Sequence, residues 1–323
     1  MQELDEKKEV KSKKEVKSKK EVESNTEIES KNEVELNTDI EAKNEIATQE
    51  DKDKKEMAYV SKWRLFTNAW SIWRVTAKAK KITRKIKQDP NLYSEEWRYN
   101  WVKKKIRKVL KIANVQIDVI GIENWLDRGI VLAPNHQSNL DSILMLAINN
   151  FSLQQPVAFI AKQELWKTKI FKHFMNLTDN VPLDRNNPRS ALSAMKEAKE
   201  LISDYKRSVV IFPEGTRSAK QELEEFMPAS MKLAQMAYVP IVPVSIIDSY
   251  KLFQKRKHGR FVIKVVFGKP MMPEKFISLK TEMLTKNVQK EVEKNINLYK
   301  DWDPKKLGLQ PKKIDKKNRT NFY

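Results

Sequence analysis

Two short stretches of the sequence contain side chains that could carry out chemistry. The first runs from Asn135 to Asp141 and places His136 five residues before Asp141. A carboxylate held against an imidazole fixes the ring's tautomer and stabilises its protonated form, so such a pair can act as a general base. The spacing alone is weak support, because a His followed by an Asp at this distance arises by chance in about one such chain in ten.

The second stretch runs from Phe212 to Ser218 and reads Phe-Pro-Glu-Gly-Thr-Arg-Ser. Gly215 permits a tight turn and a close approach to the backbone, and exposed amides beside Arg217 would suit a phosphate group. The chain has only 6 Gly, so a Gly at the end of a strand indicates a requirement of the backbone. Taken alone, these residues also fit an ordinary turn that ends a strand, with Arg217 in solvent.

Each stretch follows a short apolar run that predicts a buried strand. Residues 129–133 lead into His136, and residues 208–212 lead into the second stretch. Ser138 or Asn139 can cap a helix that continues to Ile148, and the first turn of that helix would fold Asp141 back onto His136. Sites in open α/β sheets form at the carboxyl ends of strands, which is where this pair would lie.

The rest of the sequence predicts that strands and helices alternate. We expect strands at 115–121, 241–247 and 261–267, and helices near 188–202, 229–237 and 281–299. This alternation favours an α/β fold with a mostly parallel mixed sheet flanked by helices, preceded by an N-terminal amphipathic, membrane-associating helical segment. The expected divisions are a disordered, charged repeat tail (1–56), the amphipathic helical segment at the membrane interface (57–112), the α/β domain (113–300) and a basic C-terminal tail (301–323).

Charge is distributed unevenly along the chain. Residues 1–56 contain 13 Lys and 18 acidic residues, whereas the rest of the chain has a net charge of +25. The tail repeats one aliphatic residue every six positions from Val10 to Ile46, and that period forms no apolar face on a helix. So little apolar surface cannot offset the entropy of ordering, and the tail is predicted to be disordered.

An aromatic stripe begins shortly after the tail. Its four members, Trp63, Phe66, Trp70 and Trp73, recur at helical spacing among Lys and Arg. A second helix is predicted to begin at Ser94 and to continue through Trp97 and Trp101 with many Lys. Trp and basic residues together are typical of a helix that lies at a bilayer surface with anionic lipids. An aromatic stripe that packs into the core has the same spacing and remains the alternative.

Several classes of protein are excluded or disfavoured. The chain has no Cys, which excludes disulfides, thiolate nucleophiles and Cys-ligated zinc. No cleavable signal peptide and no apolar run long enough for a membrane span is visible. Basic and aromatic residues also occur in nucleic-acid-binding proteins, but none of the accompanying zinc, RNP-type or zipper patterns is present, so no nucleic-acid partner is expected.

The two stretches together resemble the glycerolipid acyltransferase family, and most closely its 1-acyl-sn-glycerol-3-phosphate acyltransferases. Both motifs occur in the family's order, at 135–141 and 212–218. Residues 161–165, 181–185 and 241–244 are similar to three further blocks of the family. The resemblance covers roughly residues 57–270 and does not extend to the tail.

The resemblance implies acyl transfer from an activated fatty acyl donor to the sn-2 hydroxyl of 1-acyl-sn-glycerol-3-phosphate, giving phosphatidic acid. His136, oriented by Asp141, would take the proton of the attacking hydroxyl, and Gly215 would support the oxyanion through its amide. Glu214 would order its loop. The substrate-phosphate ligands would be Lys162, Arg185, Thr216 and Arg217.

The family needs no metal or cofactor; the acyl donor would be acyl-CoA, acyl-carrier-protein or another activated acyl group. Expected partners are therefore anionic membrane lipids, lysophosphatidic acid and an acyl donor, for which acyl carrier protein is one candidate carrier. The implied location is peripheral or monotopic, on the cytoplasmic face of the cell membrane. The alternatives are acylation of glycerol-3-phosphate or another lysophospholipid, or a protein that binds anionic lipid without catalysis.

This chain departs from the family pattern at positions that shape the acyl and acceptor channels. Lys169, Lys172 and Asp179 replace frequent Pro and Gly residues, and Met227 and Ala229 replace a frequent Lys and Gly. The reaction type is therefore better defined than the substrate.

Overall fold

The computed structural model describes residues 62–150, 155–169, 171–184, 186–253, 260–317 and 319–323. Contacts divide the chain into Met1–Met57 and Ala58–Tyr323, and the description that follows concerns the second unit. The predicted disordered tail, Arg185, and the side chains of Trp63 and Phe66 lie outside the described residues.

The described residues form one nine-stranded sheet with the order β4-β3-β5-β2-β6-β7-β1-β9-β8. Neighbouring strands are parallel except for β6 with β7 and β8 with β9. The strands are β1 (Val115–Ile120), β2 (Ile130–Pro134), β3 (Val157–Lys162), β4 (Val181–Leu183), β5 (Ser208–Val210), β6 (Ile241–Ile247), β7 (Phe261–Phe267), β8 (Lys313–Asp315) and β9 (Thr320–Phe322). The predicted α/β class with a mostly parallel mixed sheet is confirmed.

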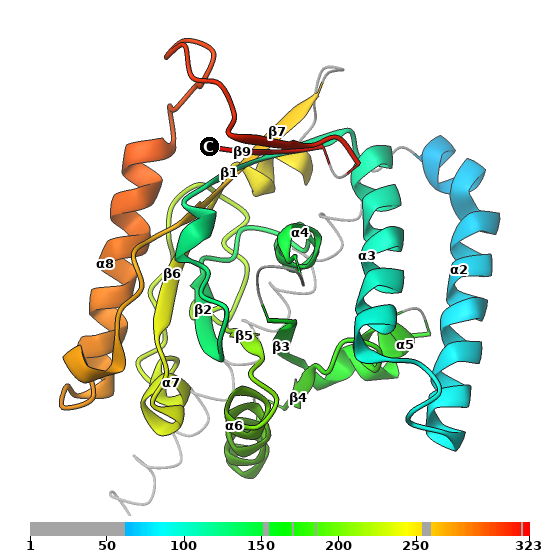
Figure 1. The fold of residues 1–323 in the computed structure, drawn as a ribbon, viewed down its shortest axis with the longest axis horizontal. Coiled ribbons are helices and arrows are strands. Elements are labelled where there is room, and N and C mark those ends of the chain that lie inside the picture. Colours follow the sequence, from blue (N-terminus) through cyan, green and yellow to red (C-terminus); the bar gives the residue numbers. More distant parts are fainter. Residues whose placement is uncertain (1–61, 151–154, 170, 185, 254–259, 318) are drawn as a thin grey trace, which may run out of the picture. The chain divides into compact units, whose positions relative to one another are not determined.

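Helices cover both faces of this sheet (Figure 1). They are α2 (Lys62–Gln88), α3 (Glu95–Ile112), α4 (Leu140–Ile148), α5 (Phe171–Met175), α6 (Pro188–Ser203), α7 (Lys232–Ala237) and α8 (Thr281–Tyr299). Short 3₁₀ turns occur at η2 (Ile122–Asn124), η3 (Gln163–Lys167), η4 (Ser249–Phe253) and η5 (Pro273–Lys275).

The central strands are apolar throughout because the core lies on both sides of them. Along β2, Ile130 and Leu132 pack in the cluster formed with α2, α3 and α4, whereas Val131 and Ala133 pack in the cluster formed with α6, α7 and α8. Successive side chains of a strand point to opposite faces, so each apolar run contributes to both clusters. The strands before the two motifs are thus fixed from both sides.

Trp residues of the two N-terminal helices lie in different environments. α3 begins at the predicted cap, where Ser94 Oγ accepts from the Trp97 amide at 3.3 Å, and its Trp101 is buried in the core. For Trp101 the core-packing alternative therefore holds. α2 packs through Ala79 and Ile82 and leaves Trp70 and Trp73 each 66% exposed.

The C-terminal segment contributes two strands to the sheet. β9 pairs parallel with β1, and β8 pairs antiparallel with β9, so residues 313–315 and 320–322 extend the sheet. Buried Lys264 of β7 holds the C-terminus of α8 against the sheet. Its Nζ donates to the carbonyls of Tyr299 at 2.9 Å and Lys300 at 2.5 Å. A cation there complements the partial negative charge of the helix end.

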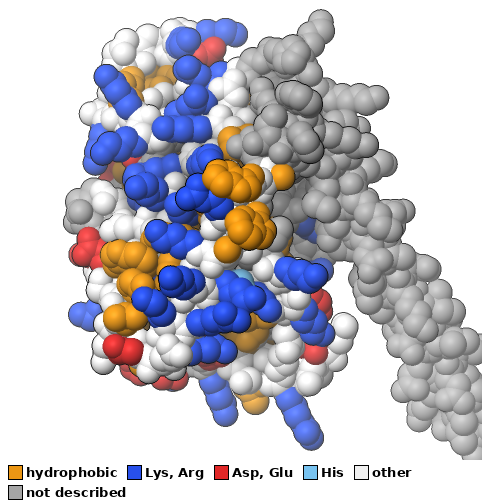
Figure 2. All heavy atoms as spheres, turned by 90° about the vertical axis from the view of Figure 1, so that its right-hand side faces the viewer, with side chains coloured by type: hydrophobic (Ala, Val, Ile, Leu, Met, Phe, Trp, Pro, Cys, Tyr) orange, Lys and Arg blue, Asp and Glu red, His pale blue; other side chains and the backbone are white. Residues whose placement is uncertain are grey.

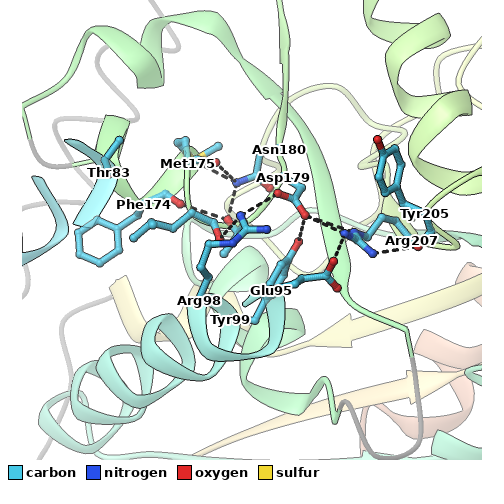
Figure 3. A network of polar contacts seen from close by, with 12 residues as sticks. Thr83, Glu95, Arg98, Tyr99, Phe174, Met175, Asp179, Asn180, Tyr205 and Arg207 are labelled. Atoms are coloured by element: carbon cyan, nitrogen blue, oxygen red, sulfur yellow. Dashed lines mark hydrogen bonds and ion pairs between the residues drawn. The ribbon is translucent and has the colours of Figure 1, made fainter. Parts of the chain in front are cut away.

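A cluster of ion pairs lies at the edge of the sheet where the parallel strands begin (Figure 3). Arg207 precedes β5, is 6% exposed at its side chain, and contacts both Glu95 and Asp179, the latter at 3.1 Å. Asp179 also pairs with Arg98 at 3.1 Å and accepts from the Tyr99 hydroxyl at 3.4 Å. The cluster links the first turn of α3 to the residues that precede β4 and β5. Asp179, one of the departures from the family pattern, thus has a structural role.

Replacing Arg207 should therefore destabilise the fold. In Arg207→Ala the carboxylates of Glu95 and Asp179 lose a buried counter-charge, and we expect the free energy of unfolding to fall by about 3 kcal/mol. Lys294→Ala is the control, because Lys294 is 68% exposed in its pair with Glu291 and its removal should cost less than about 0.5 kcal/mol. Denaturant unfolding measures both variants. Equal losses would contradict the assigned role of Arg207.

Candidate active site

The two motifs lie at one edge of the sheet because the strands before them are parallel neighbours. β2 pairs with β5 on one side and with β6 on the other, so the carboxyl ends of all three strands meet at this edge. β2 leads into the loop of His136, and β5 leads into the loop of Glu214 and Arg217. The position agrees with the general location of sites in open α/β sheets.

The predicted contact between the two chemical side chains of the first motif is present. Nδ1 of His136 lies 2.9 Å from Oδ2 of Asp141. The same oxygen accepts from the backbone amides of Gln137 at 2.7 Å and Ser138 at 2.8 Å. The Asp141 side chain is fully buried and the His136 side chain is 17% exposed. With Nδ1 facing the carboxylate, Nε2 is the ring nitrogen left to exchange a proton with a substrate.

Two further contacts hold the motif loops together. The His136 amide donates to Oε1 of Glu214 at 2.6 Å, and the Ser218 amide donates to the His136 carbonyl at 2.9 Å. The His136 ring also stacks on Phe212, with ring centroids 4.0 Å apart. The second motif therefore fixes both the backbone and the ring plane of the histidine.

Glu214 is buried between the loops. Its second oxygen accepts from the Glu224 amide at 3.0 Å. Burial raises the pKa of the Glu214 carboxyl to about 7, and the backbone donors of His136 and Glu224 oppose that shift. Both carboxylate oxygens are thus used inside the protein, so the predicted loop-ordering function is consistent with the geometry.

Gly215 adopts the left-handed conformation that the motif requires, with φ of 69°. Its amide donates to the Phe212 carbonyl at 3.1 Å and closes the turn, so the amide that the sequence predicts as an oxyanion donor is already engaged. The next amide, that of Thr216, donates to no group in the part of the chain that the structure describes. A Cβ on Gly215 would lie 2.6 Å from the sulfur of Met227, so Met227 covers this turn.

The structure brings only some of the predicted phosphate ligands to the histidine. Arg217 contacts the Asn139 side chain in the first motif, and burial lowers the pKa of its guanidinium. Thr216 is exposed in the same loop, and Lys162 is exposed at the carboxyl end of β3, which neighbours β5. Arg185 lies outside the described residues.

Several residues that support the site were not singled out from the sequence. Asn135 continues the pairing of β2 with β6, accepting from the Ile246 amide at 2.6 Å and donating to the Ile246 carbonyl at 3.0 Å. Gln137 accepts from the Ser249 amide at 3.1 Å. An amide side chain directly after a buried strand was an available signal, but nothing near Ser249 indicates a role.

Comparison with known proteins identifies relatives of this chain. A family model described as Acyltransferase matches residues 116–247. The chain is 31% identical to the probable 1-acyl-sn-glycerol-3-phosphate acyltransferase of Mycoplasma pneumoniae, over 65% of this chain and 82% of that protein. For the protein of the same name from Mycoplasma genitalium, the identity is 30% over 62% of this chain and 78% of that protein.

A solved structure is also similar to this chain. The crystal structure of the 1-acyl-sn-glycerophosphate acyltransferase PlsC from Thermotoga maritima is 26% identical, with a TM-score of 0.54 over 74% of this chain and 99% of that chain. Fold, motif geometry and sequence similarity therefore agree, and this chain belongs to the acyltransferase family that these relatives represent.

Proposed function

We propose that this chain transfers a fatty acyl group to the sn-2 hydroxyl of 1-acyl-sn-glycerol-3-phosphate and forms phosphatidic acid. The observation that carries the proposal is the buried Asp141 carboxylate 2.9 Å from Nδ1 of His136, joined to the loop of Arg217 in a chain whose relatives bear that activity in their names. Acylation of glycerol-3-phosphate or of another lysophospholipid uses the same groups and is the competing assignment.

The attacking group in this reaction is the hydroxyl of the acceptor lipid. Nε2 of His136 takes the hydroxyl proton as the oxygen forms a bond to the carbonyl carbon of the acyl donor. Asp141 keeps the ring in the tautomer with the proton on Nδ1 and stabilises the imidazolium. When the carbonyl re-forms, the bond to the donor's leaving group breaks, and the imidazolium returns the proton to that group.

The tetrahedral intermediate carries a negative oxygen that needs donors. The amide of Thr216 is the donor that the geometry favours, because the Gly215 amide closes the turn. Arg217 and Thr216, with Lys162 from β3 and Arg185, hold the substrate phosphate. Guanidinium groups bind phosphate through paired hydrogen bonds, and this contact distinguishes an acceptor that bears a phosphate from a neutral glyceride.

The acyl donor is acyl-CoA, acyl-carrier-protein or another activated acyl group. The leaving group belongs to the donor, and no thiol of the protein takes part, since the chain contains no Cys. No cofactor takes part in the scheme. Anionic membrane lipids and lysophosphatidic acid are the other partners.

The membrane contact is assigned to the exposed face of α2, on the cytoplasmic side of the cell membrane. Figure 2 shows hydrophobic side chains among many Lys and Arg on the side of the molecule that carries α2. Trp70 and Trp73 are exposed in α2, and the Arg74 guanidinium lies 4.5 Å from the centre of the Trp70 ring. No helix in the described part of the chain is long and apolar enough to cross a bilayer. This arrangement is consistent with peripheral or monotopic attachment.

Removing the proposed base tests the function directly. The protein, bound to vesicles that contain lysophosphatidic acid, should form phosphatidic acid with at least one acyl donor. His136→Ala and Asp141→Asn should lower kcat at least 100-fold, as expected for loss of general-base catalysis, and should keep vesicle binding. His173→Gln, on α5, is the control and should keep native activity. Vesicle binding without product from the native chain would favour a lipid-binding protein, and faster acylation of glycerol-3-phosphate would reassign the acceptor.

Glu214 should give the stability of the fold a specific pH dependence. Because burial raises the folded pKa to about 7 from the ordinary value of 4.5, the folded state binds the proton more tightly than the unfolded state between these values. The free energy of unfolding contributed by this group should therefore fall by about 3 kcal/mol as the pH rises from 4.5 to 7, and stay level above that.

Denaturant unfolding across this pH range measures the effect as the difference between the native chain and Glu214→Gln. The difference should change with pH by the expected amount. Glu224→Gln is the control, because it keeps the backbone amide from which Glu214 accepts. A difference that does not vary with pH would mean that Glu214 has an ordinary pKa in the folded state.

The two exposed Trp residues should set vesicle affinity. We expect Trp70→Ser with Trp73→Ser to weaken partitioning into anionic vesicles at least tenfold, since each loses aromatic area that the interface would bury. Leu298→Ser on α8 is the matched control, because Leu298 is also 66% exposed. Co-sedimentation with vesicles measures all three proteins. Native partitioning of the double variant would remove α2 as the contact.

A further inference from the structure

Two serine hydroxyls connect the Asp141 carboxylate to the end of strand β6. Ser138 Oγ lies 3.2 Å from Asp141 Oδ1 and 3.1 Å from Ser249 Oγ. Ser138, Asp141 and Ser249 are all fully buried. Ser249 begins η4, lies 111 residues after Ser138 in the sequence, and belongs to neither motif. Only the Ser138 hydroxyl lies between the Ser249 hydroxyl and the Asp141 carboxylate that contacts His136.

The direction of these hydrogen bonds follows from the number of protons. A carboxylate only accepts, so the single hydroxyl proton of Ser138 points to Oδ1 of Asp141. Ser138 Oγ accepts from the Leu140 amide at 3.2 Å. With the Ser138 proton on Asp141, the 3.1 Å contact between the two hydroxyls uses the Ser249 proton, for which Oε1 of Gln137 at 3.5 Å is the more distant acceptor. A hydroxyl that accepts while it donates is polarised and becomes a stronger donor. Ser249 therefore strengthens the bond that Ser138 makes to Asp141.

The backbone fixes Ser249 in this position. Its amide donates to Oε1 of Gln137 at 3.1 Å, and the preceding residue, Asp248, has a left-handed φ of 74° that turns the chain at the end of β6. Gln137 is itself buried between His136 and Ser138 in the first motif. The hydroxyl of Ser249 is thus held at Ser138 by a bond that does not depend on either hydroxyl.

We propose that Ser249 is a positioning residue for acyl transfer, acting through Ser138 on the orientation of Asp141 and hence on the His136 ring. Oδ2 of Asp141 has three donors, and Oδ1 has the Ser138 hydroxyl as its donor in the described part of the chain. The bond to Oδ1 therefore limits rotation of the carboxylate plane. This inference rests on the proposed function for its kinetic consequence, and on geometry alone for its effect on the histidine.

Steady-state kinetics with phosphatidic acid as product test the consequence. Ser249→Ala should lower kcat about tenfold with KM for lysophosphatidic acid unchanged, because one hydrogen bond to the carboxylate is weakened. Ser245→Ala is the matched control: Ser245 is fully buried in β6, and its hydroxyl donates to the Val292 carbonyl at 2.9 Å, away from the site. A kcat of Ser249→Ala within twofold of the native value, or an equal loss in Ser245→Ala, would overturn the proposal.

A second measurement is independent of activity. The chain contains only 3 His, so isotope-labelled histidine gives few ring signals, and the one that disappears in His136→Gln belongs to His136. That signal should shift in Ser249→Ala and stay in place in Ser245→Ala. An unshifted signal overturns the inference even if the native chain forms phosphatidic acid. A shifted signal in a chain that forms no phosphatidic acid supports the coupling and rejects only the proposed function.

Discussion

The Asp141 carboxylate is completely buried, and a buried carboxylate costs several kcal/mol unless hydrogen bonds replace its lost water. The chain meets this requirement with the amides of Gln137 and Ser138, the Ser138 hydroxyl and the His136 ring. Those amides belong to residues between the two chemical side chains. The loop must therefore curl around the carboxylate, and the position of the histidine follows from the solvation of the aspartate.

A second buried carboxylate extends the same constraint to the neighbouring loop. Glu214 accepts from the amides of His136 and Glu224, so the second motif takes its shape partly by satisfying a donor of the first. This is possible because β2 and β5 are adjacent and parallel, and adjacent strands lie only about 4.8 Å apart. Burial between the two loops disfavours the ionised carboxylate, which is why the pKa of Glu214 is raised. In return, one side chain holds both loops together.

The sequence predicts the elements with a long apolar pattern most closely, and it misses β3 and three short strands. The strands 241–247 and 261–267 and the helix 281–299 are found with the expected bounds, because their length and period identify them. β4, β8 and β9 have three residues each, too few to show a period, and they depend on pairing with neighbours. Trp101 illustrates a different limit: core and interface helices share one period, so spacing alone cannot assign its environment.

The site shows the same division between local and distant information. The contact of His136 with Asp141 spans five residues and forms between a loop and the first turn of the helix that follows it, so it is a local contact that the sequence predicts. The contact of Ser138 with Ser249 depends on the adjacency of β2 and β6, which no local pattern encodes. The Gly215 amide is the intermediate case: the turn was predictable from the glycine, but the bond that closes the turn uses the very amide that was expected to face the substrate.

Charges are paired at the edge where the parallel strands begin. Where the strands begin, Arg98 and Arg207 are matched by Asp179 and Glu95, so this cluster stabilises the fold and has little net charge for a ligand. The surplus positive charge of the folded part therefore lies elsewhere on the surface, and under the proposed function it would attract anionic lipid over about 8 Å at physiological salt. Such attraction does not fix orientation. Under the proposed function, apolar contacts of Trp70 and Trp73 would act only at the interface, so charge would govern arrival at the membrane and the aromatic side chains would govern the bound orientation.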